Sequence, residues 1–220
     1  MSNAIPIPAG VSAQALANTA TIRNAYLLLT MILGVSALTA WYAIASNAQM
    51  INIWIFLAFM IGMPYLIQAT RNSPAGLALA FAYAGLLGYF LGPIVGVYFR
   101  MDPNIPVYAL AATSVIFFSL SGYALVSRRN FNFLGGFVFV GFLVILGAAL
   151  ANMFLQMPLL SVVISAAAVL LISAAILYET SQLIHDPDAN YIVIATSLMA
   201  SIWVLFLHLM RLFSFFSGED

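Results

Sequence analysis

The stretch ISAAILYETSQLIHDPDAN, Ile172 to Asn190, is an apolar segment with one acidic residue inside it, Glu179. The segment gives way to polar residues at His185, so a spanning helix would place Glu179 within about 10 Å of one membrane face. An ionised carboxylate at that depth is costly unless it is paired, hydrated or neutralised. We therefore expect Glu179 to have a functional role and a partner elsewhere in the chain.

Composition indicates that the whole chain is an integral membrane protein. Of its 220 residues, 65% are hydrophobic and 5% are charged, against about 25% charged residues in an average soluble domain. The net charge is zero and the basic residues are all arginines, which leaves no polybasic patch for nucleic acid or anionic lipid, so we expect neither partner. The absence of lysine excludes a retinal Schiff base, and the absence of cysteine excludes disulfides, thiolate metal sites and cysteine nucleophiles.

Seven apolar runs are each long enough to cross about 30 Å of hydrocarbon, which predicts an all-α fold of seven transmembrane helices. The predicted spans are 24–46, 51–69, 75–99, 105–126, 132–154, 158–184 and 191–213. Short connections make successive helices antiparallel neighbours in a single domain over residues 21–216. Residues 1–20 are small and polar, which predicts a flexible cytoplasmic tail and no signal peptide, and residues 217–220 form a short C-terminal tail.

The arginines predict the orientation of the chain in the membrane. With a cytoplasmic N-terminus, four arginines lie inside and two outside, in agreement with the positive-inside rule. The inner ones are Arg23, Arg71, Arg128 and Arg129, and the outer ones are Arg100 and Arg211. Seven spans then place the C-terminus in the periplasm, and the acidic loop with Asp186 and Asp188 at the cytoplasmic face, near Glu179.

Glycines in the third predicted helix indicate close helix packing. Gly88, Gly92 and Gly96 recur every four residues on one face, where a neighbouring backbone can approach closely. Pro93 removes one backbone hydrogen bond in the same helix, which predicts a kink. We interpret this face as helix packing rather than as a pore lining.

Four sequence runs resemble the Bax inhibitor-1 family, most closely its bacterial YccA-type branch. They are FLGPIVG (90–96), RRNFNFLGG (128–136), ANMFLQMP (151–158) and ILYETSQLIH (176–185), and the resemblance covers about residues 20–216. It implies a seven-helix fold in which the last helix is enclosed by the first six, in a bacterial inner membrane. It also implies one of two activities: modulation of the membrane-anchored ATP-dependent protease FtsH, or a pH-sensitive calcium leak.

The resemblance also implies where a pH sensor would lie. The family's sensor is described as two aspartates, in the sixth and seventh helices, held by an arginine at the end of the second. Glu179 matches the first aspartate, Ser201 stands at the second position, and Thr70 stands at the arginine position with Arg71 beside it. Two close carboxylates share one proton and bind calcium together, and a single carboxylate does neither as well. The sequence therefore supports the calcium leak less than it supports protease modulation.

Several readings of these residues remain open. Arg71 could reach Glu179 from the same membrane face, Ser201 could donate one hydrogen bond to it, or Glu179 could extend to the interface without a partner. A Ser121 and His208 pair would suggest an intramembrane protease, but an isolated Ser-Gly is more typical of packing. Two histidines without cysteine cannot supply the three protein ligands of a catalytic zinc site unless carboxylates join them, and we expect no metal site and no cofactor.

The sequence therefore predicts a non-enzymatic protein that acts within the lipid bilayer. Its predicted activity is to bind and modulate an FtsH-type protease by helix contact, with the N-terminal tail as a further contact. The alternative is a pH-sensitive leak for calcium or other cations, gated by protons near Glu179.

Overall fold

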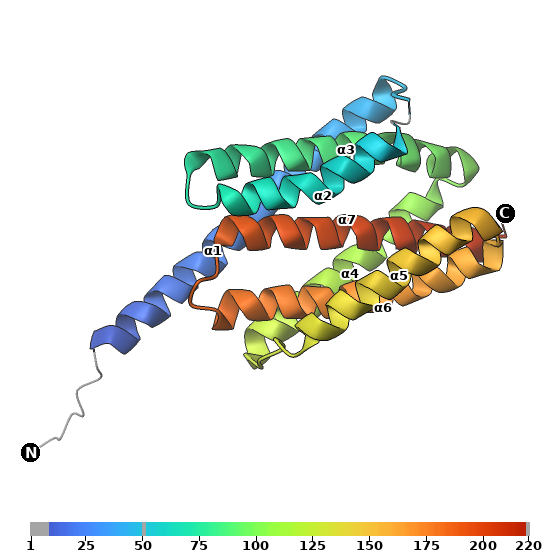
Figure 1. Ribbon diagram of the computed structural model, residues 1–220. Helices are drawn as coiled ribbons and strands as arrows, with labels where there is room; N and C mark the ends of the chain where they lie inside the picture. The colour runs from blue at the N-terminus through green and yellow to red at the C-terminus, as the bar shows by residue number, and fades with distance from the viewer. Residues whose placement is uncertain (1–8, 50–51, 219–220) are drawn as a thin grey trace, which may run out of the picture.

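The computed structural model describes residues 9–49 and 52–218, which form seven α-helices and confirm the predicted all-α architecture (Figure 1). Six of these helices are long and apolar enough to cross a membrane, and α2 is a shorter apolar helix. The helices are α1 (Ala9–Ala45), α2 (Ile53–Ala69), α3 (Pro74–Met101), α4 (Asn104–Ser127), α5 (Leu134–Leu155), α6 (Pro158–His185) and α7 (Tyr191–Phe216).

The first helix begins earlier than the sequence predicted. We expected it to start at Asn24, but α1 starts at Ala9 and includes residues 9–20 of the predicted tail. Alanine recurs at positions 9, 13, 15, 17 and 20, and alanine has the highest intrinsic helix propensity, so the hydrophobic span continues outward as helix. The boundary of the predicted tail therefore moves, and residues 1–8 lie outside the described residues.

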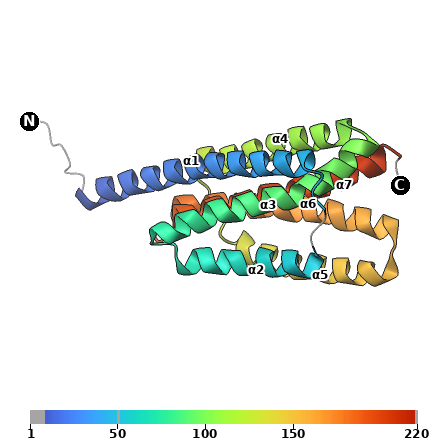
Figure 2. The ribbon, with the colours of Figure 1, turned by 90° about the horizontal axis from the view of Figure 1, so that it is seen from above.

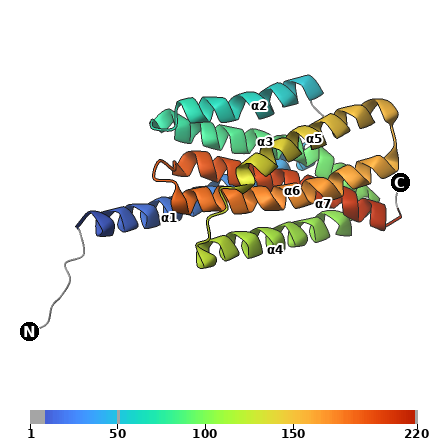
Figure 3. The ribbon, with the colours of Figure 1, turned by 60° about the horizontal axis from the view of Figure 1, so that its bottom comes forward.

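Helix α7 lies at the centre of the bundle. Figure 1 shows it between the α2 and α3 pair on one side and the α5 and α6 pair on the other, and Figure 3 shows its first turns between α3 and α6. Helix α7 contacts α1, α2, α3, α4 and α6. Its side chains supply much of the buried core, with Ala195, Leu198, Met199, Leu205 and Met210 completely buried. These side chains are buried because α7 is apolar and other apolar helices surround it.

Helix α5 stands outside the ring around α7. In the described part of the chain it contacts α6 and no other helix, and it has no buried residue. Five helices therefore enclose α7, where the family resemblance implied six. The reason is that α5 is apolar on all sides, and lipid solvates such a helix as well as neighbouring helices do.

Two of the three predicted packing glycines lie against α1. A Cβ atom added to Gly88 would clash with the carbonyl oxygen of Ser36, and one added to Gly92 would lie 2.5 Å from the Cβ of Ala43. Gly96 has open space at the same position, with no atom within 4 Å. Gly88 and Gly92 thus allow α1 and α3 to approach closely, and α3 continues through Pro93 to Met101.

Candidate functional site

Glu179 is held by one residue of the central helix. The hydroxyl of Ser201 on α7 lies 3.2 Å from Oε1 and 3.0 Å from Oε2 of Glu179 on α6. Both side chains are partly buried between these two neighbouring helices. A serine hydroxyl carries a single proton, so it donates to one carboxylate oxygen at a time. The contact is one shared hydrogen bond, about 9 Å from the end of α6.

Arg71 does not form the predicted ion pair with Glu179. Within residues 9–49 and 52–218 no salt bridge joins the two side chains, and α2 does not contact α6 because α7 lies between them. Arg71 stands in the α2–α3 loop, where its carbonyl oxygen accepts a hydrogen bond from Asn190 Nδ2 at 3.0 Å. The structure therefore gives Glu179 a hydroxyl partner on α7 in place of the predicted partner Arg71.

A chain of hydroxyl groups lies beside Glu179 and was not predicted from the sequence. Ser121 on α4 is hydrogen-bonded to the hydroxyl of Tyr26 on α1 and lies 3.4 Å from the hydroxyl of Thr180 on α6. Ser121 and Thr180 are buried, so each needs a partner in the low-dielectric interior. The sequence shows only that Ser121 and Thr180 are small hydroxyl residues in two apolar helices. That pattern does not indicate that the two side chains contact each other.

The structure does not bring Ser121 and His208 together. Ser121 lies in the hydroxyl chain just described, and Nδ1 of His208 lies 3.2 Å from the hydroxyl of Ser165, which is fully buried. Ser165 in turn donates to the carbonyl oxygen of Ser161 at 2.9 Å. The arrangement satisfies polar groups between α6 and α7, and it does not assemble the Ser121 and His208 pair considered above.

The acidic α6–α7 loop is a short turn that leads into α7. A carboxylate oxygen of Asp186 accepts a hydrogen bond from the backbone N–H of Asp188 at 2.9 Å. Asn190 then caps α7, because its Oδ1 accepts from the N–H of Ile192 at 2.9 Å. Asparagine is a preferred residue at this position since its oxygen satisfies a free helix donor. The loop residues thus set where the central helix begins.

Three loops meet at this end of the bundle. Asn190 Nδ2 donates to the carbonyl of Arg71 in the α2–α3 loop, and His185 Nε2 lies 3.0 Å from the carbonyl of Arg128 in the α4–α5 loop. The other ring nitrogen of His185, Nδ1, lies 3.1 Å from the carbonyl oxygen of Ser181. Ser181 accepts from the backbone of the α4–α5 loop at 2.8 Å. The end of α6 and the start of α7 therefore fasten the two arginine-bearing loops together.

Comparison with known proteins identifies the family of the chain. Residues 18–218 match the family described as "Inhibitor of apoptosis-promoting Bax1". An uncharacterised protein of Pseudomonas aeruginosa is 40% identical over 202 residues, which cover 90% of each chain. The "Modulator of FtsH protease YccA" of Escherichia coli K12 is 38% identical over 199 residues, covering 90% of this chain and 91% of the relative.

These relatives agree with the architecture described above. A second Escherichia coli sequence with the same identity and coverage is named "Inner membrane protein YccA", and a Vibrio cholerae membrane protein is 32% identical over 203 residues. The matched region begins inside α1 and ends after α7, so it includes all seven helices. The chain is therefore a multi-pass inner-membrane protein that belongs to the Bax inhibitor family.

Proposed function

We propose that this protein binds a membrane-anchored ATP-dependent protease of the FtsH type and modulates its activity without catalysing a reaction itself. The observation that carries the proposal is the 38% identity, over 90% of the chain, to the relative named as a modulator of FtsH protease. The similarity covers 90% of this chain, so it extends over most of the bundle surface that could contact a partner in the membrane.

The exposed faces of α5 support a contact within the membrane. This helix contacts α6 alone among the described helices and presents large apolar side chains over the rest of its surface, including Phe137, Phe139, Phe142 and Phe154. Transmembrane helices associate through close packing of such surfaces rather than through exclusion of water. A spanning segment of the protease can pack against α5 without displacing any helix of the bundle.

The first turns of α1 support a second contact outside the membrane. Figures 1 and 2 both show α1 extending past the ends of the other helices towards the N-terminus. We place this extension in the cytoplasm, because the loops with Arg71, Arg128 and Arg129 follow the positive-inside rule in that orientation. A helix end that extends past the bundle near a chain terminus is the kind of segment that an ATP-dependent protease engages.

Co-purification tests the proposal directly. A tagged copy of the protein, extracted from its native membrane in mild detergent, should carry the FtsH-type protease with it. Degradation of a reporter substrate by the isolated complex should differ from degradation by the protease alone. The matched control is an unrelated inner-membrane protein with the same tag and expression level. Absence of the protease from the sample, with unchanged degradation in a mixture of the purified proteins, would reject the proposal.

A pH-sensitive cation leak is the second candidate, and the position of Glu179 favours it. This acid lies inside a spanning helix, and in the described part of the chain it is hydrogen-bonded to the hydroxyl of Ser201 rather than paired with a cation. Calcium flux into liposomes that contain the purified protein, measured across a pH range, tests it. Flux that disappears in Glu179→Gln would favour the leak. No flux in the wild-type protein, together with co-purification of the protease, would favour the modulator.

A further inference from the structure

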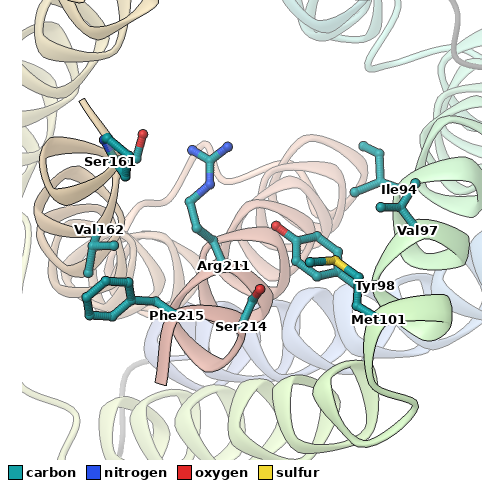
Figure 4. A pocket seen from close by; sticks show the side chains of 10 residues that line it. Ile94, Val97, Tyr98, Met101, Ser161, Val162, Arg211, Ser214 and Phe215 are labelled. Atoms are coloured by element: carbon teal, nitrogen blue, oxygen red, sulfur yellow. The ribbon is translucent and has the colours of Figure 1, made fainter. Parts of the chain in front are cut away.

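A cavity lies at the end of the bundle opposite Glu179. It has a volume of about 440 Å³ and lies between the end of α3, the start of α6 and the end of α7 (Figure 4). Helices α3 and α6 do not contact each other, so the cavity occupies the space between them, beside α7. Its walls are mainly apolar and include Ile94, Val97, Met101, Val162 and Phe215.

Arg211 of α7 supplies a positive charge to this cavity. Figure 4 shows its guanidinium group pointing into the open space between α6 and α3. Among the described residues it has neither a hydrogen bond nor an ion pair, and the side chain is exposed. Arg211 lies five residues before Phe216, the end of α7, which is about 8 Å along the helix. That depth is near the boundary between acyl chains and headgroups, where an arginine requires an anion or water.

Ser161 of α6 lines the same cavity and has a proton to donate. Asn152 Oδ1 accepts from the backbone N–H of Met157 at 3.1 Å, which fixes the orientation of its amide group. Asn152 Nδ2 therefore donates to the hydroxyl of Ser161, at 2.6 Å. Since Ser161 accepts in that contact, its own hydroxyl hydrogen can point to a ligand in the cavity. The start of α6, with the positive end of its helix dipole, lies at the same wall.

We propose that this cavity binds the phosphate group of an anionic phospholipid, with Arg211 and Ser161 as donors to the phosphate oxygens. A guanidinium group forms paired hydrogen bonds with phosphate, and the volume lies within the range of about 300–1,000 Å³ that is usual for small-ligand sites. The apolar walls favour a lipid over a soluble phosphate ion, because only a lipid has acyl chains to place against them. This site is independent of the proposed contact with a protease, and it depends on one arginine in a cavity rather than on the polybasic patch whose absence led us to expect no anionic lipid.

Short-chain lipids allow a direct test with the purified full-length protein in an uncharged detergent. Binding of dioctanoyl phosphatidylglycerol is measured by native mass spectrometry and by the shift of the unfolding temperature. Dioctanoyl phosphatidylcholine and inorganic phosphate are measured in parallel. We expect phosphatidylglycerol to bind more tightly than phosphatidylcholine and to raise the unfolding temperature, with little effect from phosphate alone. Equal binding of the two lipids overturns the proposal, and an equal effect of phosphate alone assigns the site to a soluble anion instead.

Two variants and a matched control locate the binding site. Arg211→Gln should weaken binding of phosphatidylglycerol roughly tenfold, while Arg211→Lys, which keeps the charge and loses the paired geometry, should weaken it less. The control is Arg100→Gln, because Arg100 is predicted on the same membrane side but lines a different, smaller cavity with Gly92 and Gly96. Unchanged affinity in a folded Arg211→Gln protein, or an equal loss in Arg100→Gln, overturns the proposal. If Arg211→Gln does not fold, the comparison of the two lipids on the wild-type protein decides.

Discussion

At the scale of single residues, the partner of Glu179 determines what the site can do. Ser201 stands where the family resemblance places a second carboxylate, and it donates one hydrogen bond to Glu179. A hydroxyl in this position does not share a proton between two acids, and it offers calcium no charged oxygen. Because both side chains lie between α6 and α7, the pair also links the central helix to its neighbour.

Double-mutant cycles compare the coupling energy between Glu179 and Ser201 with that between Glu179 and Arg71, the ion pair that the sequence suggested. We expect Glu179→Met and Ser201→Ala to be coupled by about 0.5–1.5 kcal/mol, because each removes one partner of a single hydrogen bond. Glu179→Met and Arg71→Ala should be additive within about 0.5 kcal/mol, since the two residues do not touch. Unfolding in detergent gives the free energies for both cycles. Stronger coupling to Arg71 than to Ser201 would contradict the geometry described here.

At the scale of helices, glycine positions determine how closely α1 and α3 pack. Gly88 and Gly92 lie against the α1 backbone and side chains, and Gly96 faces open space in the same row. A regular four-residue spacing therefore does not give three equivalent positions. The row runs from a tight contact to a small cavity lined by Gly92, Gly96 and Arg100, because α1 ends at Ala45 and the chain turns away.

Alanine substitutions along this row should give graded effects on stability. Gly88→Ala places a methyl group against the Ser36 carbonyl, so we expect a loss of about 1–3 kcal/mol in the free energy of unfolding. Gly96→Ala adds the same methyl group in open space and should be neutral, or stabilising because alanine favours the helix. Thermal unfolding of both variants in the same detergent provides the measurement. Equal losses at the two positions would contradict the assignment of Gly88 to a close helix contact and of Gly96 to open space.

The extension at the start of α1 gives a prediction for the lifetime of the protein. The family match begins at residue 18, so deletion of residues 2–17 leaves the matched bundle complete. If an FtsH-type protease engages this end, the deletion should lengthen the lifetime of the protein in cells. The lifetime is followed after synthesis is stopped, with membrane insertion checked by fractionation. An unchanged lifetime in an inserted protein would argue against engagement at the N-terminus.

At the scale of the whole molecule, the two ends of the bundle differ in their number of arginines. The α2–α3 and α4–α5 loops, with Arg71, Arg128 and Arg129, are fastened to the α6–α7 segment at one end through Asn190 and His185. The opposite end has the cavity with Arg211 and the start of α6. The excess of arginine at the first end predicts that it faces the cytoplasm.

Reporter fusions test this orientation. A reporter that works only in the periplasm should be active when fused after Asp220, and a reporter that works only in the cytoplasm should be inactive there. Fusions after Asn130, in the α4–α5 loop, should give the reverse pattern and serve as the matched control. The opposite result at both junctions would invert the orientation and place the Arg211 cavity in the cytoplasmic leaflet.

The sequence by itself determined the membrane class, the number of helices, most of their ends and the family. These properties depend on local features, because hydropathy over about 20 residues sets a span and polar residues set its limits. The motif positions also named Glu179 and Ser201, which the structure brings into contact.

Only the tertiary structure determined which helices are neighbours, and with them the contacts that the sequence missed. Four features depend on how the helices pack against one another. They are the absence of an Arg71 ion pair, the position of α5 outside the ring, the hydroxyl chain through Ser121 and the cavity at Arg211. In a membrane, the lipid-facing and the core-facing side chains are equally apolar, so hydropathy carries little information about which face packs against which helix.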